Sequence, residues 1–428
     1  MAKGLIIAAP QSGSGKTLVT LGLAHALMKR GLRIAPAKSG PDYIDPAFLS
    51  LAAGRASINL DAWAMAPSRL RQLAAPHSQD ADLLLIEGAM GLFDGAADGR
   101  GSTGDLAAVL GLPVVLVVDC ARIGQSVAAL VEGFVRHRAD VTIAGLILNR
   151  IGSPRHAEML GEALMPIGLP ILGSLARDTA LAIPERHLGL VLPQSMTYAE
   201  TLIARAASAV ENDLDVKALL EIARPIPTGT ETSGLPPLGQ RIAIAQDPAF
   251  AFIYEHWLAD WREAGAELSF FSPLADESPR ADADAIFLPG GYPELHAGAL
   301  AAAAQFRKAM QSAAQRGTLI YGECGGYMVL GRALTDASGG THEMLGLLPH
   351  DTRIDAPRRT LGYRRLTHSG SLPWSKNLAG HEFHYSSESG PGGHPLFAAA
   401  DARGQQLAPM GAIAGRICGS YAHVIDAA

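Results

Sequence analysis

Short apolar runs alternate with stretches of helical periodicity through the first half of the chain. The apolar runs are rich in Val, Ile and Leu and carry almost no polar residues, which is typical of strands buried on both faces of a parallel sheet. The longer segments between them repeat apolar residues at helical spacing. We therefore expect a sheet covered by helices, with strands at residues 4–10, 33–40, 82–88, 113–119, 143–150 and 170–177.

The alternation stops at residues 223–240, which hold four prolines and three threonines among several glycines. That composition is typical of an exposed linker. The pattern then begins again, with a helix expected at about 250–264 and a long alanine-rich helix before the last of four strands. These strands are expected at residues 241–246, 267–273, 284–291 and 317–323.

A chain of 428 residues is too long for one compact core. We predict an α/β protein of two domains, with residues 1–222 in the first and 241–428 in the second, joined by the linker 223–240.

Composition and charge narrow the class of protein. Hydrophobic residues make up 48% of the chain and charged residues 18%, which is typical of a folded protein. A formal net charge of −6 gives no general attraction for nucleic acid or an anionic membrane, so an anionic ligand needs a local basic site. The longest apolar run, 106–118, is too short to span a bilayer. Three widely spaced cysteines and an N-terminus without signal-peptide features predict a cytoplasmic protein.

A glycine-rich segment follows the first expected strand and opens the first helix. APQSGSGKT, residues 9–17, has the context of a phosphate-binding loop, although Pro10 replaces the first glycine of the usual pattern. Backbone N–H groups of such a loop bind phosphate, a lysine adds positive charge, and a hydroxyl can hold Mg²⁺. The residues predicted to bind ATP are Gly13, Ser14, Gly15, Lys16 and Thr17, with Thr17 also a metal ligand.

The next strand ends in AKSGPDYIDP, at the carboxyl edge of the sheet, where ligands of parallel sheets bind. We therefore expect Lys38, Asp42 and Asp45 to lie near the phosphates. Asp45 followed by Pro46 also has the pattern of a helix cap. A metal or substrate role and a capping role both remain open for the two aspartates.

Two later strand ends carry further polar residues. Glu87 ends an apolar strand, which is where a Walker-B carboxylate holds Mg²⁺, and glutamate is a poor helix cap. Asp94, in the glycine-rich loop that follows, is a weaker candidate. Asn149 and Arg150 end another strand, where an amide can contact a purine base, and we assign them to nucleotide binding.

A cysteine stands on a predicted strand-to-helix turn in the second half, in GTLIYGECGGYMVLG. Such a turn lifts its central residue out of the sheet, and Gly322 and Gly326 suggest backbone angles that a side chain would forbid. A helix N-terminus lowers the pKa of a thiol. Cys324 is therefore a candidate nucleophile, and a buried structural cysteine is the alternative.

Two other segments can complete a thiol site. FLPGGYPE ends a strand with two glycines, so we assign the backbone N–H groups of Gly291 and Gly325 to an oxyanion hole. GSYAHVID supplies His423 as the base for the thiol. His381 and His384 of GHEFHYSS remain competitors, because a catalytic base is adjacent to its cysteine in space and not in sequence.

Taken in order, SGSGKT, GPDYIDP, IEGAMGLFDG, PGGYPE, YGECGGYM, GHEFHYS and GSYAH make the whole chain resemble the cobyrinic or hydrogenobyrinic acid a,c-diamide synthases. These are glutamine-dependent amidotransferases of the corrin pathway. The N-terminal half is also similar to dethiobiotin synthetase, which implies a P-loop NTPase-like parallel sheet. The C-terminal half resembles class I glutamine amidotransferases, which implies a flavodoxin-like domain.

Class I domains usually end in His-Pro-Glu, whose Glu orients the His. Here Val424 and Ile425 follow His423. The third member of the site is therefore missing or comes from elsewhere, an absence that the corrin amidases share.

The resemblance implies amidation of the a and c acetate groups of a tetrapyrrole in cobalamin biosynthesis, with ATP and glutamine as co-substrates and Mg²⁺ as cofactor. Cys324 would attack the glutamine amide and His423 would protonate the departing ammonia. Magnesium ATP would phosphorylate the carboxylate, so that ammonia can displace phosphate. The implied roles are Lys16 and Lys38 on the phosphoryl group, Thr17, Asp45 and Glu87 on the metal, and Asp42 near the acyl phosphate.

A multiply charged substrate needs a local basic patch, and residues 351–366 carry five arginines. Arginine binds carboxylates in a bidentate manner. We assign Arg358 and Arg359 to the substrate, together with Tyr43 and Asp94. A solvated charged loop is an equal alternative for the arginines.

Other functions fit parts of the pattern. A nickel-sirohydrochlorin a,c-diamide synthase is an alternative that the sequence does not separate from the corrin enzymes. Cobyric acid synthase has the same two domains, but GPDYIDP is not its pattern. A ParA-type switch ATPase would require a lysine at Gln11 and leaves the second half unexplained. We expect no nucleic acid or membrane partner. A homodimer is one expectation, because such amidotransferases often dimerise. The metal in the ring and the order of the two amidations stay open.

Overall fold

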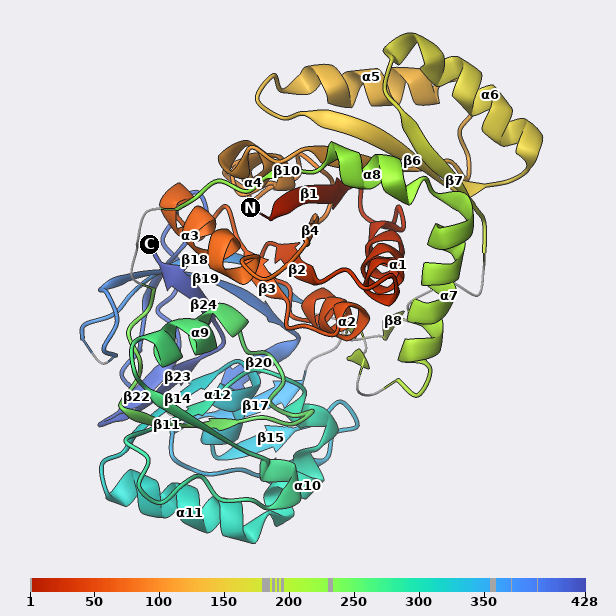
Figure 1. The fold of residues 1–428 in the computed structure, drawn as a ribbon. Coiled ribbons are helices and arrows are strands. Elements are labelled where there is room, and N and C mark those ends of the chain that lie inside the picture. Colours follow the sequence, from red (N-terminus) through yellow and green to blue (C-terminus); the bar gives the residue numbers. More distant parts are fainter. Residues whose placement is uncertain are drawn as a thin grey trace. The chain divides into compact units, whose positions relative to one another are not determined.

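The computed structural model describes residues 2–178, 185–186, 189–190, 192–193, 196–229, 234–354, 359–370, 372–390 and 392–428. The chain forms two compact units, Met1–Thr232 and Ser233–Ala428, and the boundary falls inside the segment 223–240. Figure 1 labels many of their elements. No helix in the described ranges is long and apolar enough to cross a membrane.

The N-terminal unit is built on a sheet whose neighbouring strands run parallel along the main path. All six strands predicted for this half are present. β3 was not predicted, because three residues are too few for a periodicity to show. In spatial order the strands are β3 (Ile58–Leu60), β2 (Ile34–Ser39), β4 (Leu83–Glu87), β1 (Lys3–Ala8), β5 (Val114–Asp119), β6 (Ile143–Ile151) and β7 (Ile171–Ala176).

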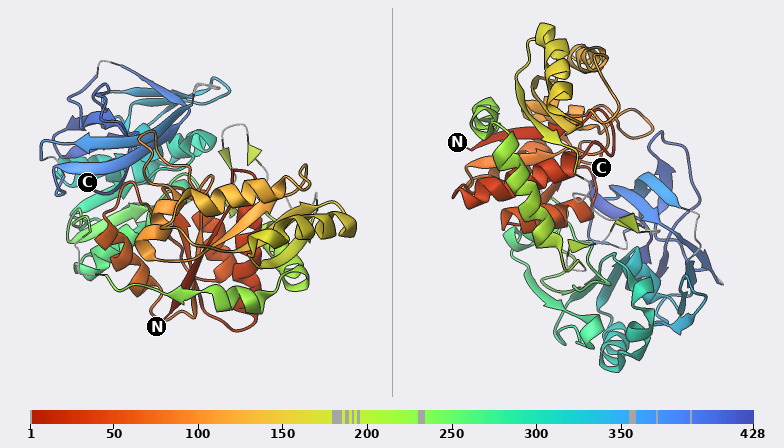
Figure 2. Two further views of the ribbon diagram at one scale, coloured as in Figure 1. Left: turned by 90° about the horizontal axis from the view of Figure 1, so that it is seen from above. Right: turned by 90° about the vertical axis from the view of Figure 1, so that its right-hand side faces the viewer.

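Helices connect these strands and bury their apolar faces against the sheet. α1, α2 and α7 pack together, α3 packs on α4, and α5 lies beside α6, as both views of Figure 2 show for the last pair. The bounds are α1 (Lys16–Lys29), α2 (Ile44–Ala53), α3 (Pro67–His77), α4 (Thr103–Leu110), α5 (Val127–His137), α6 (Pro154–Leu164), α7 (Ala199–Asp213) and α8 (Val216–Ile222), with η1 (Met165–Ile167), β8 (Glu185–Arg186) and β9 (Gly189–Leu190) between them.

The described residues of the segment 223–240 are partly exposed and partly buried. β10 (Arg224–Pro225) pairs with β1 in antiparallel orientation. Ile226, Leu235 and Leu238 are buried. Apolar side chains therefore fix both ends of this segment, the first to the N-terminal unit and the second to the C-terminal unit.

The C-terminal unit has a central sheet that is parallel except for its edge strand β22. The four predicted strands are β11, β12, β13 and β14. In spatial order the sheet contains β12 (Glu267–Phe271), β11 (Arg241–Ala245), β13 (Ala285–Leu288), β14 (Leu319–Glu323), β23 (Ile417–Ser420) and β22 (Ala412–Ala414). Trp257, Trp261, Phe287 and Tyr321 pack as a buried aromatic cluster in this unit.

Two helix predictions for this unit need correction. The helix expected from about residue 250 begins later, as α9 (Glu255–Glu263). The long alanine-rich helix is two helices, α10 (Ala297–Ala302) and α11 (Ala304–Gln315), because Ala303 leaves the helical conformation at φ −72° and ψ 81°. α12 (Gly325–Leu330) follows β14, and single turns lie at η3 (Pro273–Ala275) and η4 (Pro293–Leu295).

Strands between residues 333 and 427 form two further sheets that the periodicity did not predict. One has the order β16 (Thr341–Glu343), β15 (Ala333–Thr335), β17 (Asp351–Ile354) and β20 (Ser386–Ser389). The other, fully antiparallel, has the order β21 (Ala398–Asp401), β18 (Thr360–Thr367), β19 (Asn377–His384) and β24 (His423–Ala427). The candidate base His423 thus begins the last strand.

Candidate functional site

The predicted phosphate loop is a left-handed turn that opens α1. Gly15 is the N-cap of the helix at φ 86°, and Gly13 also has a positive φ of 76°. A Cβ on Gly15 would lie 2.2 Å from Asn149 Nδ2, which donates to Ser14 O at 2.8 Å. Position 15 therefore requires glycine both for its backbone angle and for the close approach of Asn149.

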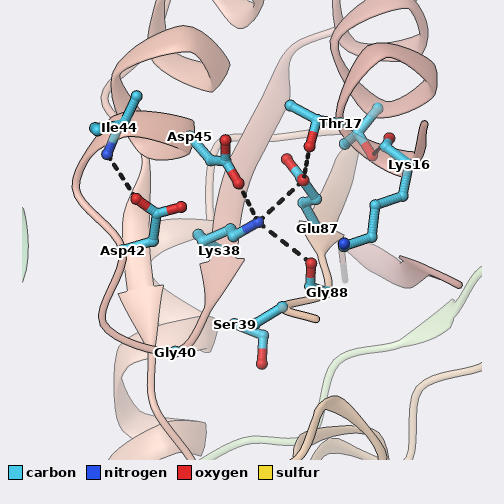
Figure 3. A network of polar contacts seen from close by, with 12 residues as sticks. Lys16, Thr17, Lys38, Ser39, Gly40, Asp42, Ile44, Asp45, Glu87 and Gly88 are labelled. Carbon is cyan, nitrogen blue, oxygen red and sulfur yellow. Dashed lines mark hydrogen bonds and ion pairs between the residues drawn. The ribbon is translucent and has the colours of Figure 1, made fainter. Parts of the chain in front are cut away.

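Lys38 lies at the centre of a buried polar network, shown in Figure 3. Its ammonium donates to Asp45 Oδ2 at 2.5 Å, Glu87 Oε1 at 3.0 Å and the Gly88 carbonyl at 3.2 Å. Thr17 Oγ1 donates to the same Glu87 oxygen at 2.6 Å. The parallel pairing of β2 with β4 sets Lys38 beside Glu87, so the ends of two strands and the starts of two helices converge here.

Burial and charge act against each other in this network. Burial alone would lower the pKa of Lys38, but the charges of Asp45 and Glu87 raise it above its ordinary value. Burial would raise the pKa of Asp45, yet the contact with Lys38 lowers it, whereas burial dominates at Glu87 and raises its pKa. Burial and the charge of Lys38 lower the pKa of Lys16. The network therefore holds a permanent cation between two carboxyl groups.

The oxygens of Thr17, Asp45 and Glu87 form a donor set that suits Mg²⁺. The Lys38 ammonium already contacts the two carboxylates, so this position accepts a cation. No three His, Cys, Asp or Glu side chains gather into a metal-binding cluster in the part of the chain that the structure describes. Mg²⁺ does not need one, because it is usually held by one or two carboxylates together with water and phosphate oxygens.

The two aspartates of GPDYIDP have different surroundings. Asp42 Oδ1 accepts the backbone N–H of Ile44 at 2.8 Å, so it caps the start of α2, whereas Asp45 lies within the first turn and contacts Lys38. Burial and the charge of Asp45 raise the pKa of Asp42 to about 7. Tyr43, between them, is the N-cap residue of α2.

Asp94 is exposed, and its Oδ2 accepts the backbone N–H of Gly91 at 2.9 Å. This contact gives Asp94 a role in holding the turn of the glycine-rich loop. Its assignment to the substrate stays a prediction.

A cavity of about 650 Å³ lies beside the phosphate loop, lined among others by Pro10, Gln11, Asp119 and Arg150. Arg150 has a positive φ of 60° and pairs with Asp119 at 2.5 Å. The Asn149 Oδ1 accepts the backbone N–H of Arg150 at 2.9 Å. Asn149 therefore supports both the loop and the cavity wall, and its predicted contact with the base stays a prediction.

Cys324 occupies a sharp turn between β14 and α12, as predicted. The strained backbone is that of Cys324 itself, at φ 45° and ψ −105°. Gly322 and Gly326 are not in the left-handed region, so the expectation about their angles was wrong. A Cβ on Gly326 would lie 1.8 Å from Leu288 O, and one on Gly322 2.9 Å from Gly326 C, so close packing requires both glycines.

His423 lies beside the thiol. A Cβ on Gly290 would lie 2.4 Å from His423 Cε1 and 3.3 Å from Cys324 Cβ, so the two side chains flank this glycine. A Cβ on Gly325 would lie 3.0 Å from Gly291 N, which brings the predicted oxyanion residues together. The structure thus gathers Cys324, His423, Gly291 and Gly325, and adds Gly290, which the sequence reasoning did not single out.

The thiol does not have the lowered pKa expected at a helix N-terminus. Burial, with the charges of Glu294, Glu323 and Glu382, raises the pKa of Cys324, and a hydrogen bond from the Gly325 backbone only partly opposes it. Burial also lowers the pKa of His423. The thiol therefore rests protonated and needs a base to ionise.

His381 and His384 have other surroundings. The ring of His381 lies edge-to-face with that of His423, with centroids 5.1 Å apart. His384 stacks on Tyr421 at 4.4 Å, and its Nε2 lies 3.4 Å from Glu382 Oε1. Of these two histidines, His381 contacts the ring of His423, whereas His384 contacts Tyr421 and Glu382.

Glu323 is a further site residue that the sequence reasoning missed. Its Oε2 lies 3.8 Å from His423 Nδ1. The available signal was its position immediately before Cys324 in YGECGG.

The arginines of the 351–366 segment are divided. Arg358 lies outside the described residues, and Arg359 is exposed. Arg364 pairs with Glu382, and Arg365 Nη2 donates to Ala402 O at 3.3 Å. Arg359 remains the described member of the predicted substrate pair.

Comparison with known proteins agrees with this division. Residues 5–191 match the model of the CobQ/CobB/MinD/ParA nucleotide binding domain, and residues 241–428 match that of the CobB/CobQ-like glutamine amidotransferase domain. The hydrogenobyrinate a,c-diamide synthase of Rhizobium meliloti (strain 1021) is 54% identical over 424 residues, which cover 99% of each chain.

The chain belongs to the hydrogenobyrinate a,c-diamide synthase family. Other members are the enzymes of that name from Brucella abortus, 54% identical over 99% of this chain and 98% of its own, and from Mesorhizobium japonicum, 48% identical with the same coverage. A solved glutamine amidotransferase from Thermotoga maritima is 13% identical, with a TM-score of 0.29, and covers 43% of this chain and 75% of its own. A likeness of that size adds nothing to the assignment.

Proposed function

We propose that this chain uses ATP and glutamine to convert the a and c acetate carboxylates of hydrogenobyrinic acid to amides, in cobalamin biosynthesis. The observation that carries the proposal is the presence of two sites in a chain that a hydrogenobyrinate a,c-diamide synthase matches over 99% of its length. One site has the charges that phosphoryl transfer needs. The other has the thiol, base and backbone N–H groups that acyl transfer needs.

In the C-terminal unit, His423 takes the proton of the Cys324 thiol, and the sulfur attacks the carbonyl carbon of the glutamine side chain. The N–H groups of Gly291 and Gly325 stabilise the oxyanion. The carbon–nitrogen bond then breaks, and the departing nitrogen takes the proton from His423 and leaves as ammonia. Water hydrolyses the thioester to glutamate and restores the thiol.

In the N-terminal unit, the γ-phosphoryl group of ATP passes to a carboxylate oxygen of the ring. A carboxylate resists ammonia because its charge repels the nucleophile and oxide is a poor leaving group. The acyl phosphate removes both obstacles, and ammonia displaces phosphate to give the amide. Lys16 and Lys38 neutralise the transferring phosphoryl group, Gly13, Ser14 and Gly15 bind its oxygens, and Asp42 lies near the acyl phosphate.

Mg²⁺ is the cofactor in this proposal, held by Thr17, Asp45 and Glu87. When bound, it neutralises phosphate charge and orients the phosphoryl group. The support from the structure is that Asp45 and Glu87 both contact one cation, the Lys38 ammonium, and that Thr17 Oγ1 contacts the same Glu87 oxygen. If Mg²⁺ took over the two carboxylates, two N–H groups of the Lys38 ammonium would become available to the phosphate.

The test is mass spectrometry of the ring after incubation with MgATP and a nitrogen source. Hydrogenobyrinic acid, cobyrinic acid and nickel-sirohydrochlorin are each incubated with glutamine or with ammonia, using the wild type and Cys324→Ala. We expect two successive amidations of hydrogenobyrinic acid, lost in the variant with glutamine but kept with ammonia. ATP hydrolysis without amidation of any ring would reject the proposal.

A further inference from the structure

We propose that Glu323 is the positioning residue of His423, and that it takes the place of the glutamate that follows the histidine in a His-Pro-Glu ending. The inference rests on the proposed glutaminase roles of Cys324 and His423. It assigns the third member of the site to the residue immediately before the nucleophile.

The contacts of Glu323 fix its carboxylate in place. Oε1 accepts the Tyr321 hydroxyl at 2.8 Å and the backbone N–H of Val424 at 3.0 Å. Oε2 lies 3.8 Å from His423 Nδ1. The side chains of Glu323 and His423 are 1% and 2% exposed, so water does not compete for this contact. One carboxylate therefore contacts both the ring of His423 and the backbone of the next residue.

The position of the contact on the ring matters. Because Nδ1 lies next to Glu323, we assign the exchange of a proton with the thiol to Nε2. A separation of 3.8 Å is longer than a hydrogen bond, but catalytic hydrogen bonds are often long without substrate and shorten in the complex. A carboxylate at this place selects the tautomer with the proton on Nδ1 and stabilises the imidazolium that forms when the thiol ionises.

The fold explains why this glutamate can act. Glu323 ends β14, Cys324 is the next residue, and His423 begins β24. Carboxyl and thiol groups are thus carried by one turn, and the imidazole is introduced from another sheet. The position of the carboxylate relative to the thiol is therefore set by two adjacent residues of the same backbone.

Other titratable groups around His423 do not replace Glu323. His381 and His384 of β19 face it, and positive charge on either disfavours the imidazolium. Cys324 faces it from the start of α12. Glu323 of β14 is the acid in contact with Nδ1 of His423. Burial raises its pKa to about 8, against the hydrogen bonds from Val424 and Tyr321, so its support of the imidazolium is strongest above that pH.

The experiment compares Glu323→Gln, Glu323→Asp and Glu388→Gln in the full-length enzyme. Glu388 is the matched control because it also accepts a tyrosine hydroxyl, that of Tyr327, at 3.1 Å. Glutamine hydrolysis is followed as kcat and KM from pH 5.5 to 10, and ammonia-driven amidation of hydrogenobyrinic acid measures the rest of the enzyme. Cys324→Ala is measured in parallel.

We expect Glu323→Gln to lower kcat for glutamine hydrolysis by about 10²-fold or more, with KM within about threefold of the wild type. The limb of the kcat/KM profile that Glu323 and His423 set together should move, because the imidazole loses a titratable neighbour. Glu323→Asp should recover at least about tenfold, since it restores the charge. Glu388→Gln should stay within about twofold of the wild type in every assay.

A normal kcat and pH profile in Glu323→Gln, with Cys324→Ala inactive toward glutamine, would overturn the inference and leave the proposed function intact. Hydrolysis of glutamine by Cys324→Ala would overturn both. If Glu323→Gln also loses ammonia-driven amidation, its fold is damaged, and Glu323→Asp decides. The aspartate variant should then show a lowered kcat and a moved limb with normal use of ammonia, and an unchanged profile would reject the positioning role.

Discussion

The two candidate sites solve the problem of burying polar groups in opposite ways. In the N-terminal unit, Lys38 is fully charged and contacts two carboxyl groups within 3.0 Å. In the C-terminal unit, burial raises the pKa of Cys324 and lowers that of His423, so the thiol and the imidazole favour their neutral forms. Pairing keeps the charges of Lys38 and Asp45 in the first site, although burial raises the pKa of Glu87, whereas burial keeps the thiol and the imidazole of the second site neutral.

This difference matches the chemistry proposed for each site. A transferring phosphoryl group carries negative charge throughout, so the protein needs permanent positive charge that is already oriented. A thiol nucleophile needs a proton that moves away and returns, so neutral groups poised around one proton serve better. We therefore expect the removal of a charged side chain to lower the rate of amidation most in the N-terminal site. Displacement of the His423 ring in the C-terminal site should impair the use of glutamine and spare the use of ammonia.

The largest effect is expected from Lys38→Met. The variant leaves two buried carboxyl groups without their cation and removes a charge from the phosphoryl group. We expect amidation to fall by about 10³-fold with either nitrogen source, and the unfolding free energy by about 3–5 kcal/mol. Steady-state rates with ammonia and chemical denaturation measure the two effects.

Lys29→Met is the control for that variant, because Lys29 is exposed in the last turn of α1. It should leave both quantities unchanged. An ammonia-driven rate for Lys38→Met within tenfold of the wild type would show that Lys38 balances charge in the resting protein only, and the comparison between the sites would lose its catalytic meaning.

Adding a methyl group to one site at a time should distinguish the two sites, because the C-terminal site is needed only for glutamine-driven amidation and the N-terminal site is needed with either nitrogen source. In Gly290→Ala the new Cβ meets His423, so we expect glutamine-driven amidation to fall by about 10²-fold, with ammonia-driven amidation preserved. In Gly15→Ala it meets Asn149 at a positive φ, so both reactions should fall. Gly161→Ala in α6, with nothing within 4 Å of the new Cβ, is the control. Equal losses with both nitrogen sources in Gly290→Ala would contradict the assignment of His423.

Both sites lie at strand ends. Because the carboxyl ends of parallel strands meet at one edge of a sheet, part of each site could be predicted from the sequence. Lys16 and Thr17 were readable from a local motif, and Lys38 and Glu87 from the shared carboxyl edge of parallel strands. The contact of Glu323 with His423 was not readable, because it joins residues 100 positions apart in different sheets. The position of the strain was also missed, since glycine spacing does not reveal that Cys324 itself takes the positive φ.

The folds of the two units were predictable to different degrees for a related reason. Parallel strands such as β4 and β5 are buried on both faces and read as continuous apolar runs. β18 has the sequence TLGYRRLT and is buried at only two positions, so it carries no such run. The two sheets formed between residues 333 and 427, and with them the strand that bears His423, therefore stayed outside the prediction.

A smaller effect is expected at the exposed arginine that we assign to the ring. Arg359→Ala should raise KM for hydrogenobyrinic acid by about tenfold, since a bidentate carboxylate contact is lost, and should leave glutamine hydrolysis unaltered. Arg416→Ala, at another exposed position of the same unit, is the control. An unchanged KM for the ring would assign the arginine segment to solvated surface.

The smallest effect is expected in stability, through a buried histidine outside both sites. His350 stacks on Tyr327 and its Nε2 lies 3.1 Å from Tyr327 O, and burial lowers its pKa from 6.5 to about 4. Below pH 6.5 the unfolded chain binds a proton that the folded protein refuses until about pH 4, so stability falls with pH across this window. The loss between pH 7 and pH 5 is about 2 kcal/mol.

In His350→Gln, whose amide can still donate to Tyr327 O, the melting temperature of the C-terminal unit should fall less steeply over this range, whereas replacement of the exposed His394 should leave the slope as it is. If the melting temperature of His350→Gln fell with pH as steeply as that of the wild type, burial would not be what keeps His350 neutral. The comparison with the buried neutral groups of the C-terminal site would then not extend to this histidine.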